Sequence, residues 1–480
     1  MLKDYTCDEV LFDEMLAKST SAVAHYKKFV KQFGEYDKQD FLRLKDEAKT
    51  QFFNEGITFA TYNNNAEGTE RIFPFDLIPR IIPAKEWDTI EKGLIQRNIA
   101  INAFLEDLYH DKKILKDGVV PHELIHTSNN LLVQMHSINP PGGIYNHISG
   151  TDVIRHSDGN YYVLEDNVRV PSGVSYVLAN RNSLKKTLPK LFRQCKVQLV
   201  KEYPDQLLQM LHTVAPQGVD EPTCVVLTPG MYNSAYFEHS FLAQSMGVEL
   251  VEGRDLFVEK NFVYMKTIYG PKRVDVIYRR VDDLFIDPLE FRSDSALGTA
   301  GLMQAYRAGN VALVNAPGTG VADDKAVYIY MPEIIKYYLG EEAILRNVPT
   351  YRCEKDDDFK YVMENVHQLV VKPVDESGGY GISIGTELTK AEIEEVKQTV
   401  KANRRKYIAQ PIMSLSVHPT YIEEADTFEP RHIDLRTFCL LGKDFQYVLP
   451  GGLTRVALKK GTLIVNSSQG GGSKDTWILS

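Results

Sequence analysis

The segment VLEDN (163–167) ends a short apolar stretch with acidic and amide side chains. An Asp-Gly dipeptide at 158–159 favours a two-residue turn, so the chain on either side of it is predicted to form a β-hairpin. In this hairpin Asp152 lies directly opposite Glu165, and Asn167 follows on the same face. Carboxylate and amide oxygens that leave room for water and phosphates suit Mg²⁺. We therefore predict that Asp152, Glu165 and Asn167 bind magnesium.

The same alternation assigns the other hairpin residues to faces. It places Ile154 and Val163 on the face of the three metal ligands, and it turns Asp166 to the opposite face, so Asp166 is set aside. The alternative is a set of solvated polar residues that close an ordinary hairpin. On spacing alone this alternative is slightly favoured, and the downstream segments decide the question.

A glycine-rich segment downstream, VVKPVDESGGYGI (370–382), has the composition of a phosphate-binding loop. Lys372 ends an apolar strand there and supplies a positive charge, and glycines let backbone N–H groups approach an anion closely. The glycines concerned are Gly378, Gly379 and Gly381. The pattern matches neither the P-loop nor the Rossmann fingerprint, and a glycine-rich turn is often merely a turn. Lys325, after the loop NAPGTGVADD, is a second phosphate-binding candidate whose alternative is a plain surface lysine.

Three further strands carry candidate residues. YIAQPIM (407–413) runs into Gln410, where a hinge would meet an adenine edge. Asp434 and Arg436 share one face of the next predicted strand, and Arg455 lies late in the return strand after a turn near Gly442-Lys443. Arginines in a cleft stabilise the charge that develops in phosphoryl transfer. A surface salt bridge is the alternative for Asp434.

Composition limits the class of protein. The 480 residues are 43% hydrophobic and 25% charged, which is typical of a globular enzyme with two or three domains. The net charge of −9 argues against nucleic-acid binding. Five scattered cysteines without a CxxC pair favour reduced thiols over disulfides or a zinc site. Because no signal-peptide pattern and no membrane-length apolar run is present, we expect a cytoplasmic protein without membrane contact.

Four regions would position the candidate residues. Residues 1–130 show helical spacing of apolar side chains, apart from a Pro-punctuated segment at 71–83 that must be irregular or extended. Residues 131–215 contain the hairpin and then a helical stretch near 183–215. Residues 216–318 begin a fresh α/β pattern with a strand at 224–230, a helix near 235–246 and a hairpin, and residues 319–480 read as strands with two helices. The pattern predicts a multidomain α/β enzyme, whose glycine-rich C-terminal segment adds to the site or forms a flexible tail.

Together these segments resemble an ATP-grasp ligase. NAPGTGVADDKAV and VVKPVDESGGYG look like its two lysine segments, YIAQPIM like the strand to the adenine hinge, HIDLRTFCLLGK like its DxRxF strand, and VLEDNVRVPSG like its ExN metal motif. In most ATP-grasp enzymes the ExN strand follows the lysines. Here it precedes them, as in glutathionylspermidine synthetase and eukaryotic glutathione synthetase. The match is closest to the circularly permuted ATP-grasp type 2 proteins and covers nearly the whole chain.

The resemblance implies an α/β (α+β) fold with a circularly permuted ATP-grasp. Its metal-binding and ATP-binding parts would be residues 131–215 and 319–480, with a Rossmann-like pre-ATP-grasp domain at 216–318 and a helical N-terminal region at 1–130 on the substrate side. One departure concerns Gly150, which stands where glutathionylspermidine synthetase has an arginine. Arg169 and Arg455 are therefore the candidates for the positive charge at an acyl phosphate.

The implied reaction is the ligation of a carboxylate to an amine or thiol through an acyl phosphate, with release of ADP and phosphate. The resemblance assigns Mg²⁺ to the three metal ligands and ATP to the lysines, the 378–381 loop, Gln410 and Asp434. Arg436 and Arg455 would stabilise the transferred phosphoryl group. An ATP-dependent small-molecule kinase and a non-catalytic nucleotide-binding scaffold are the alternatives.

The sequence predicts the substrates less specifically than the reaction. A peptide or amino-acid-like acid is expected, and association into a homo-oligomer is left open. Segments 73–80 and 140–150 are assigned to the substrate side together with Gln96 and Arg97, whereas His147 is interpreted as a structural loop residue.

Overall fold

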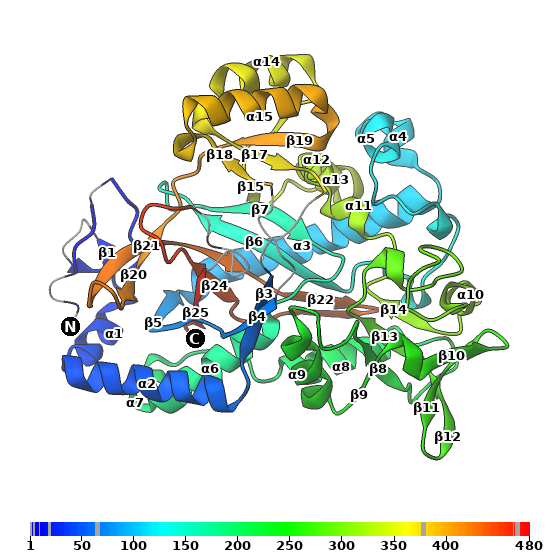
Figure 1. Cartoon of the computed structure of the whole chain (residues 1–480), viewed down its shortest axis with the longest axis horizontal. Coiled ribbons are helices and arrows are strands. Elements are labelled where there is room, and N and C mark those ends of the chain that lie inside the picture. Colours follow the sequence, from blue (N-terminus) through cyan, green and yellow to red (C-terminus); the bar gives the residue numbers. More distant parts are fainter. Residues whose placement is uncertain are drawn as a thin grey trace.

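The computed structural model describes residues 2, 5–8, 10–17, 21–62, 68–375, 381–463, 465 and 471–480. Its centre is a mixed ten-stranded sheet (Figure 1). The strands are β5 (Phe75–Ile82), β6 (Ile148–Arg155), β7 (Tyr161–Asn167), β15 (Arg346–Asn347), β20 (Val417–Ile422), β21 (Thr427–Arg436), β22 (Cys439–Gly442), β23 (Phe445–Val448), β24 (Leu453–Val456) and β25 (Gly472–Ile478). Their order is β15-β7-β6-β21-β24-β25-β5, with β20 beside β21 and the β22–β23 hairpin beside β6. The predicted turn near Gly442-Lys443 joins β22 to β23. The segment predicted as two strands, however, forms four: β21 and β22 precede the turn, and β23 and β24 follow it.

The C-terminal strand β25 lies inside this sheet and not at its margin. It pairs antiparallel with β24 and parallel with β5, and every residue of β25 is buried. A strand with neighbours on both sides and cover on both faces reads as a continuous buried run. From residue 472 onward the C-terminal segment is therefore not a flexible tail. The segment 71–83, predicted to be irregular or extended, is extended, because β5 occupies most of it.

A 26-residue helix, α3 (Ala84–Tyr109), covers one face of the central sheet (Figure 1). Its apolar residues Trp87, Ile90 and Leu94 recur at helical spacing and pack against Val163 and Leu435 of the sheet. The helix begins after Pro83, whose extended backbone ends the preceding strand.

The N-terminal region is only partly helical, because five strands lie among its described residues. Besides β5 and α3 these elements are β1 (Leu16–Ala17), β2 (Ser21–Ala22), β3 (Thr58–Tyr62), β4 (Gly68–Ile72), α1 (Lys27–Phe33), α2 (Lys38–Asn54), α4 (Lys113–Lys116) and α5 (His122–His126). The helical stretch predicted near 183–215 starts earlier and is divided into α6 (Val174–Thr187), α7 (Pro189–Cys195) and α8 (Tyr203–Thr213). Gly173, at φ +115°, turns the chain into α6, which packs against β24 and β25.

Residues 216–318 contain a four-stranded parallel sheet in the order β14-β13-β8-β9. Its elements are β8 (Cys224–Leu227), α9 (Tyr236–Met246), β9 (Glu249–Val251), β13 (Val276–Arg279), α10 (Leu302–Arg307) and β14 (Ala312–Val314). The strand predicted at 224–230 and the helix predicted near 235–246 are confirmed. The predicted hairpin is part of a small antiparallel sheet of β10 (Leu256–Glu259), β11 (Phe262–Thr267) and β12 (Gly270–Val274), which projects from the molecule (Figure 1).

A separate four-stranded sheet carries Lys372 and Gln410. Its strands, in the order β16-β19-β17-β18, are β16 (Tyr351–Arg352), β19 (Tyr407–Pro411), β17 (Leu369–Pro373) and β18 (Ser383–Ile384). It encloses its own core with α14 (Asp356–Asn365) and α15 (Lys390–Ala402). The connection from β14 contains α11 (Gly320–Asp323), α12 (Lys325–Tyr328) and α13 (Met331–Leu339). In the described part of the chain, no helix combines the length and the apolar character that crossing a bilayer requires.

Candidate active site

The β6–β7 hairpin places Asp152 opposite Glu165, as predicted. A β-bulge follows, after which Val153 pairs with Val163. The extra residue reverses the alternation, so Val163 packs with Leu435 under α3 and not beside Asp152. The prediction that Val163 shares the face of the metal ligands is therefore wrong.

The predicted two-residue turn at Asp158-Gly159 is also wrong, because His156 bonds to Asn160 and three residues, 157–159, close the hairpin. The shift of one residue at the turn and the bulge offset each other, which restores the pairing of Asp152 with Glu165.

Asp166 points away from Glu165, also as predicted, and Arg97 of α3 holds it there. The Arg97 Nε lies 2.7 Å from Asp166 Oδ1, Nη2 lies 2.6 Å from Oδ2, and both side chains are 1% exposed. Arg97 also donates to Asn347 Oδ1 of β15 at 2.8 Å. The sequence had assigned Arg97 and Gln96 to the substrate side. Instead Arg97 fixes the back of the hairpin, and Gln96 donates to Glu341 Oε2 at 2.8 Å.

We expect Arg97→Met to lower the free energy of unfolding by about 3–5 kcal/mol, because the buried Asp166 carboxylate loses its charged partner. Urea denaturation followed by circular dichroism measures the change. Lys190→Met is the matched control: Lys190 lies 3.0 Å from Glu35, both side chains are 58% exposed, and such a pair contributes at most about 1 kcal/mol. Equal losses in the two variants would contradict a structural role for the Arg97–Asp166 pair.

Two arginines converge on Asp152. Arg436 donates to both carboxylate oxygens at 2.6 and 2.8 Å, and Arg455 Nη2 donates to Oδ2 at 2.7 Å. Arg455 also holds Asp434, its cross-strand partner, with Nε–Oδ1 at 2.9 Å. Burial alone would raise the pKa of Asp152, but the guanidinium groups of Arg436 and Arg455 outweigh burial and hold the pKa well below its usual range. The structure thus brings together four predicted residues in one buried cluster of charges.

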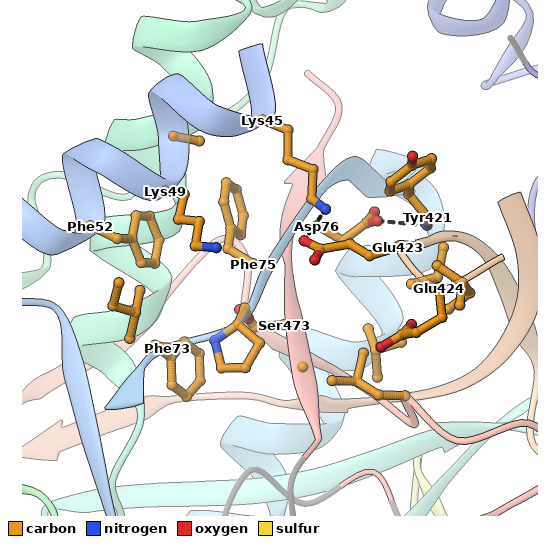
Figure 2. Close-up of a pocket in the computed structure, with 18 of the residues that line it drawn as sticks. Lys45, Lys49, Phe52, Phe73, Phe75, Asp76, Tyr421, Glu423, Glu424 and Ser473 are labelled. Carbon is orange, nitrogen blue, oxygen red and sulfur yellow. Dashed lines mark hydrogen bonds and ion pairs between the residues drawn. The ribbon is translucent and has the colours of Figure 1, made fainter. Parts of the chain in front are cut away.

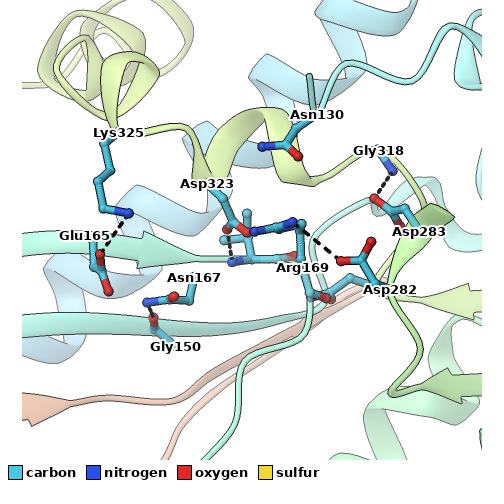
Figure 3. A network of polar contacts seen from close by, with 12 residues as sticks. Asn130, Gly150, Glu165, Asn167, Arg169, Asp282, Asp283, Gly318, Asp323 and Lys325 are labelled. Atoms are coloured by element: carbon cyan, nitrogen blue, oxygen red, sulfur yellow. Dashed lines mark hydrogen bonds and ion pairs between the residues drawn. The ribbon is translucent and has the colours of Figure 1, made fainter. Parts of the chain in front are cut away.

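Glu165 lies beside this cluster, and Asn167 follows it by two residues on β7. Figure 3 shows both side chains together with Lys325. Glu165 Oε2 is 3.4 Å from Lys325 Nζ, and Oε1 is 3.8 Å from Arg436 Nη2. Asn167 Nδ2 donates to the Gly150 carbonyl at 3.0 Å, which leaves Asn167 Oδ1 as the atom able to bind a cation.

This donor set fits the predicted magnesium ion. Glu165 and Asn167 offer hard oxygen atoms, and Asp152 is their third neighbour although arginines already engage both of its oxygens. No group of three or more His, Cys, Asp and Glu side chains forms a metal cage within the described residues. Mg²⁺ does not need such a cage, because it commonly uses one or two carboxylates and completes its shell with phosphates and water.

The two lysines come from different elements and face Glu165. Lys372 of β17 is 7% exposed and donates to Gln410 Oε1 of β19 at 2.7 Å, and Gln410 Nε2 donates to Thr350 Oγ1 at 2.9 Å. The pKa of Lys372 is lowered to about 8, chiefly by burial; the charge of Glu165 opposes this effect and the charge of Lys325 adds to it. The Gln410 side chain therefore orients a lysine, a role that the sequence did not predict.

The glycine loop is described only in part. Gly378 and Gly379 lie outside the described residues, so their prediction as phosphate-binding residues stays a prediction. Gly381 has φ +70°, and a Cβ there would lie 3.1 Å from Pro373 Cγ. A side chain at this position would therefore be strained, which accounts for the glycine.

Arg169 belongs to a different network (Figure 3). Its Nε donates to Asp323 Oδ2 at 2.6 Å, and its Nη1 lies 3.5 Å from Asp282 Oδ2. Among the contacts between described residues, none joins Arg169 to Asp152. Arg169 thus connects the segment after β7 to α11, whereas the arginines that contact the candidate metal ligands Asp152 and Glu165 are Arg436 and Arg455.

Asn315, which the sequence did not single out, joins the hairpin to the parallel sheet. It follows β14, accepts from the backbone N–H groups of His147 and Ile148 at 2.7 Å each, and donates to the Val168 carbonyl at 2.8 Å. His147 itself is buried, and burial lowers its pKa to about 3. Its structural interpretation agrees with this position. The only signal for Asn315 was a polar residue directly after an apolar strand.

Glu238 of α9 is a second residue that the sequence analysis missed. Its fully buried carboxylate accepts from the backbone N–H groups of Gly173 and Ser175 at 2.7 and 3.1 Å, and it lies 3.1 Å from Arg280. A carboxylate is favourable at the start of a helix, here α6. Glu238 thereby fixes the turn that follows Asn167. A glutamate in an apolar helix was the only sequence signal.

Comparison with known proteins assigns the fold to a family. Residues 79–457 match the family model described as circularly permuted ATP-grasp type 2. The chain belongs to this family. An uncharacterised protein of Synechocystis sp. is 54% identical to this ATP-grasp protein over 432 residues, which are 90% of this chain and 89% of that protein. The mixed α/β architecture is thus that of a circularly permuted ATP-grasp.

Two further similarities concern named proteins. A Frankia casuarinae protein with the provisional name glutamate–cysteine ligase 2-2 is 43% identical over 434 residues, which cover 88% of this chain but 48% of the Frankia protein. The structure of a glutathione synthetase-like effector from Globodera pallida, in its apo form, aligns with a TM-score of 0.59 at 12% identity. This alignment covers 92% of the ATP-grasp protein and 98% of the effector, and it concerns the fold alone.

Proposed function

We propose that this ATP-grasp protein is an ATP-dependent ligase, which joins a carboxylic acid to an amine or thiol through an acyl phosphate and releases ADP and phosphate. One observation carries the proposal: Glu165 lies between Lys325 and Arg436, at 3.4 and 3.8 Å, so cations and metal-binding oxygens share one site. The name of the Frankia relative supports a peptide or amino-acid-like acid as the substrate.

In this proposal the chain binds ATP between the four-stranded sheet that carries Lys372 and the β6–β7 hairpin. Lys325 and Lys372 contact the phosphates together with the 378–381 loop, and Gln410 orients Lys372. Glu165, Asn167 and Asp152 hold Mg²⁺, which when bound neutralises charge on the phosphates. The domain limits at 130, 215 and 318, and the pre-ATP-grasp character of residues 216–318, belong to the same proposal.

The arginines act on the transferred group. An oxygen of the substrate carboxylate attacks the γ-phosphorus, and the bond to the β–γ bridging oxygen breaks as ADP leaves. Arg436 and Arg455 stabilise the charge on the phosphoryl oxygens, and Asp434 keeps the Arg455 guanidinium in place. The amine nitrogen then attacks the acyl carbon, the carbon–oxygen bond to phosphate breaks, and the nitrogen loses a proton.

A screen for ADP release tests the proposal. Pools of carboxylic acids, amino acids and short peptides are combined with pools of amines and thiols in the presence of Mg-ATP, and adducts are detected by mass spectrometry. We expect ADP release to require one acid and one nucleophile, with a product equal to their joint mass minus water. ADP release with an acid alone, accompanied by a stable phosphorylated product, would contradict ligation and support a kinase.

The affinity for Mg-ATP is expected to fall as the pH rises through about 8. Burial lowers the pKa of Lys372 to about 8, and bound phosphates favour the protonated amine, so binding above this pH requires the uptake of a proton. Arginine stays charged in this range, so Lys372→Arg should flatten the profile. Calorimetric titrations between about pH 7 and pH 9 measure both profiles. Parallel profiles for the two proteins would contradict phosphate binding by Lys372.

A further inference from the structure

A cavity of about 620 Å³ lies between α2, the start of β5, the end of β20 and the adjoining ends of β24 and β25 (Figure 2). Pockets for small ligands typically have volumes of about 300–1,000 Å³. None of the candidate metal, phosphate or arginine residues lines this cavity. It is therefore distinct from the proposed nucleotide site.

The cavity combines an aromatic floor with a charged rim. Phe52 and Phe75 stack with ring centroids 5.2 Å apart, and Phe73 lies beside them (Figure 2). Lys45 and Lys49 of α2 form one wall, and Glu423 and Glu424, after β20, form the opposite wall.

Some of the charged side chains that line the cavity form ion pairs, and others do not. Lys45 is paired with Glu423, and Asp76 accepts from Lys474 and from the backbone N–H of Tyr421. Lys49 and Glu424 have no ion pair among the described residues, and both are exposed at the rim. Lys459, after β24, is a second exposed lysine that lines the cavity without an ion pair among the described residues. The cavity thus offers two cations, Lys49 and Lys459, and one anion, Glu424, beside an apolar surface.

The register of the central sheet joins this cavity to the arginine cluster. Arg455 of β24 is the cross-strand partner of Ser473 in β25, and Ser473 is the partner of Phe75 in β5. Both Ser473 and Phe75 line the cavity. Neighbouring strands are about 4.8 Å apart, so the cavity begins one strand away from Arg455. One extended residue spans about 3.3–3.6 Å, so one or two residues have the length of this interval.

We propose that the cavity binds the amine-bearing co-substrate, and that this co-substrate is a zwitterionic amino acid or short peptide with an apolar side chain. The inference rests on the proposed ligase function. Phe52, Phe73 and Phe75 hold the apolar side chain, Lys49 binds the carboxylate, and Glu424 binds a second polar or cationic group. The reacting amine extends toward Arg455.

Direct binding tests this proposal without relying on turnover. The probes are apolar amino acids and dipeptides, each compared with its N-acetylated and C-amidated forms by calorimetry or saturation-transfer NMR on the full chain. We expect at least one free zwitterion to bind and its C-amidated form, which loses the charge that faces Lys49, to bind about tenfold more weakly. If no probe binds, or if blocked and free forms bind equally, the proposal is overturned.

Two variants locate the bound probe. Leu458→Trp, at a 38% exposed position that lines the cavity, narrows it and should weaken probe binding about tenfold. The control Ile268→Trp, at a 91% exposed position on the β11–β12 hairpin, should leave binding unchanged. Lys49→Glu should weaken the binding of free zwitterions more than the binding of their C-amidated forms. If both Leu458→Trp and Lys49→Glu bind the probe as tightly as the unmodified protein does, the probe does not bind in this cavity.

Binding of Mg-ATP separates failure of this inference from failure of the proposed function. We expect all three variants to bind Mg-ATP as the unmodified protein does. If the zwitterion binds as expected but no acid and amine produce ADP, the ligase proposal fails while the cavity retains its ligand class. If ligation occurs and the cavity variants leave the KM for the amine unchanged, the cavity proposal fails alone.

Discussion

Glu165→Gln is expected to reduce Mg-dependent ADP formation by about 100-fold or more, while the free energy of unfolding changes little. The substitution keeps the shape of the side chain but removes the negative charge that faces Lys325 and Arg436 at 3.4 and 3.8 Å. In the proposed site this charge also holds the metal, and preorganised groups of this kind contribute about 10²–10³ in rate. Initial rates of ADP formation across a range of Mg²⁺ concentrations measure the effect.

Glu86→Gln is the matched control for Glu165→Gln. Glu86 lies 3.2 Å from Arg155 of the same hairpin and also accepts from Tyr161 at 2.9 Å. Arg155 follows Asp152 by three strand positions and points to the other face. We expect this variant to keep its rate and its Mg²⁺ dependence. If Glu165→Gln retained activity within about threefold of the control, the metal assignment would be contradicted.

Arg436→Lys is expected to reduce ADP formation by about 10²–10³-fold although the positive charge is kept. Arg436 reaches both Asp152 oxygens through two parallel hydrogen bonds, a geometry that a lysine ammonium cannot reproduce. Asp152 keeps Arg455 as a partner, so the protein should remain folded. Single-turnover measurements of ADP formation separate the effect on phosphoryl transfer from an effect on ATP binding.

The control for this variant is Arg307→Lys. Arg307 makes the same kind of paired contact with Glu290, at 2.6 and 2.9 Å, on α10. We expect it to leave turnover unchanged. Comparable losses in Arg307→Lys and Arg436→Lys would show that the effect comes from general destabilisation, and would remove Arg436 from the proposed mechanism.

Local sequence signals predicted the elements that carry the site. Alternation turned Asp166 away as predicted, and Asp152 does lie opposite Glu165, but the predicted two-residue Asp-Gly turn does not cause that pairing. Three residues close the hairpin, and a bulge offsets the shift of one residue. The bulge before Val153 was not predictable, because one extra residue in a strand leaves no mark on the apolar pattern near the turn. The position of β25 between β24 and β5 was missed for a related reason: glycines ahead of a strand resemble a tail.

The partners of the site residues were harder to predict than the residues themselves. Arg97 and Asp166 are 69 positions apart, and Asn315 joins Val168 across 147 positions. Such contacts depend on tertiary structure, which neither periodicity nor turn chemistry determines. Gln410 was predicted through its strand, yet its bond to Lys372 requires the antiparallel pairing of β17 with β19.

The fate of oxygen in the released phosphate tests the proposed ligation most directly. Substrate acids found by the ADP-release screen are labelled with ¹⁸O in the carboxylate and incubated with Mg-ATP and the amine. Formation of an acyl phosphate predicts that the phosphate recovered after amide formation carries one ¹⁸O atom from the acid. Unlabelled phosphate in the presence of the amide product would contradict the acyl-phosphate route, and release of AMP and pyrophosphate would contradict attack at the γ-phosphorus.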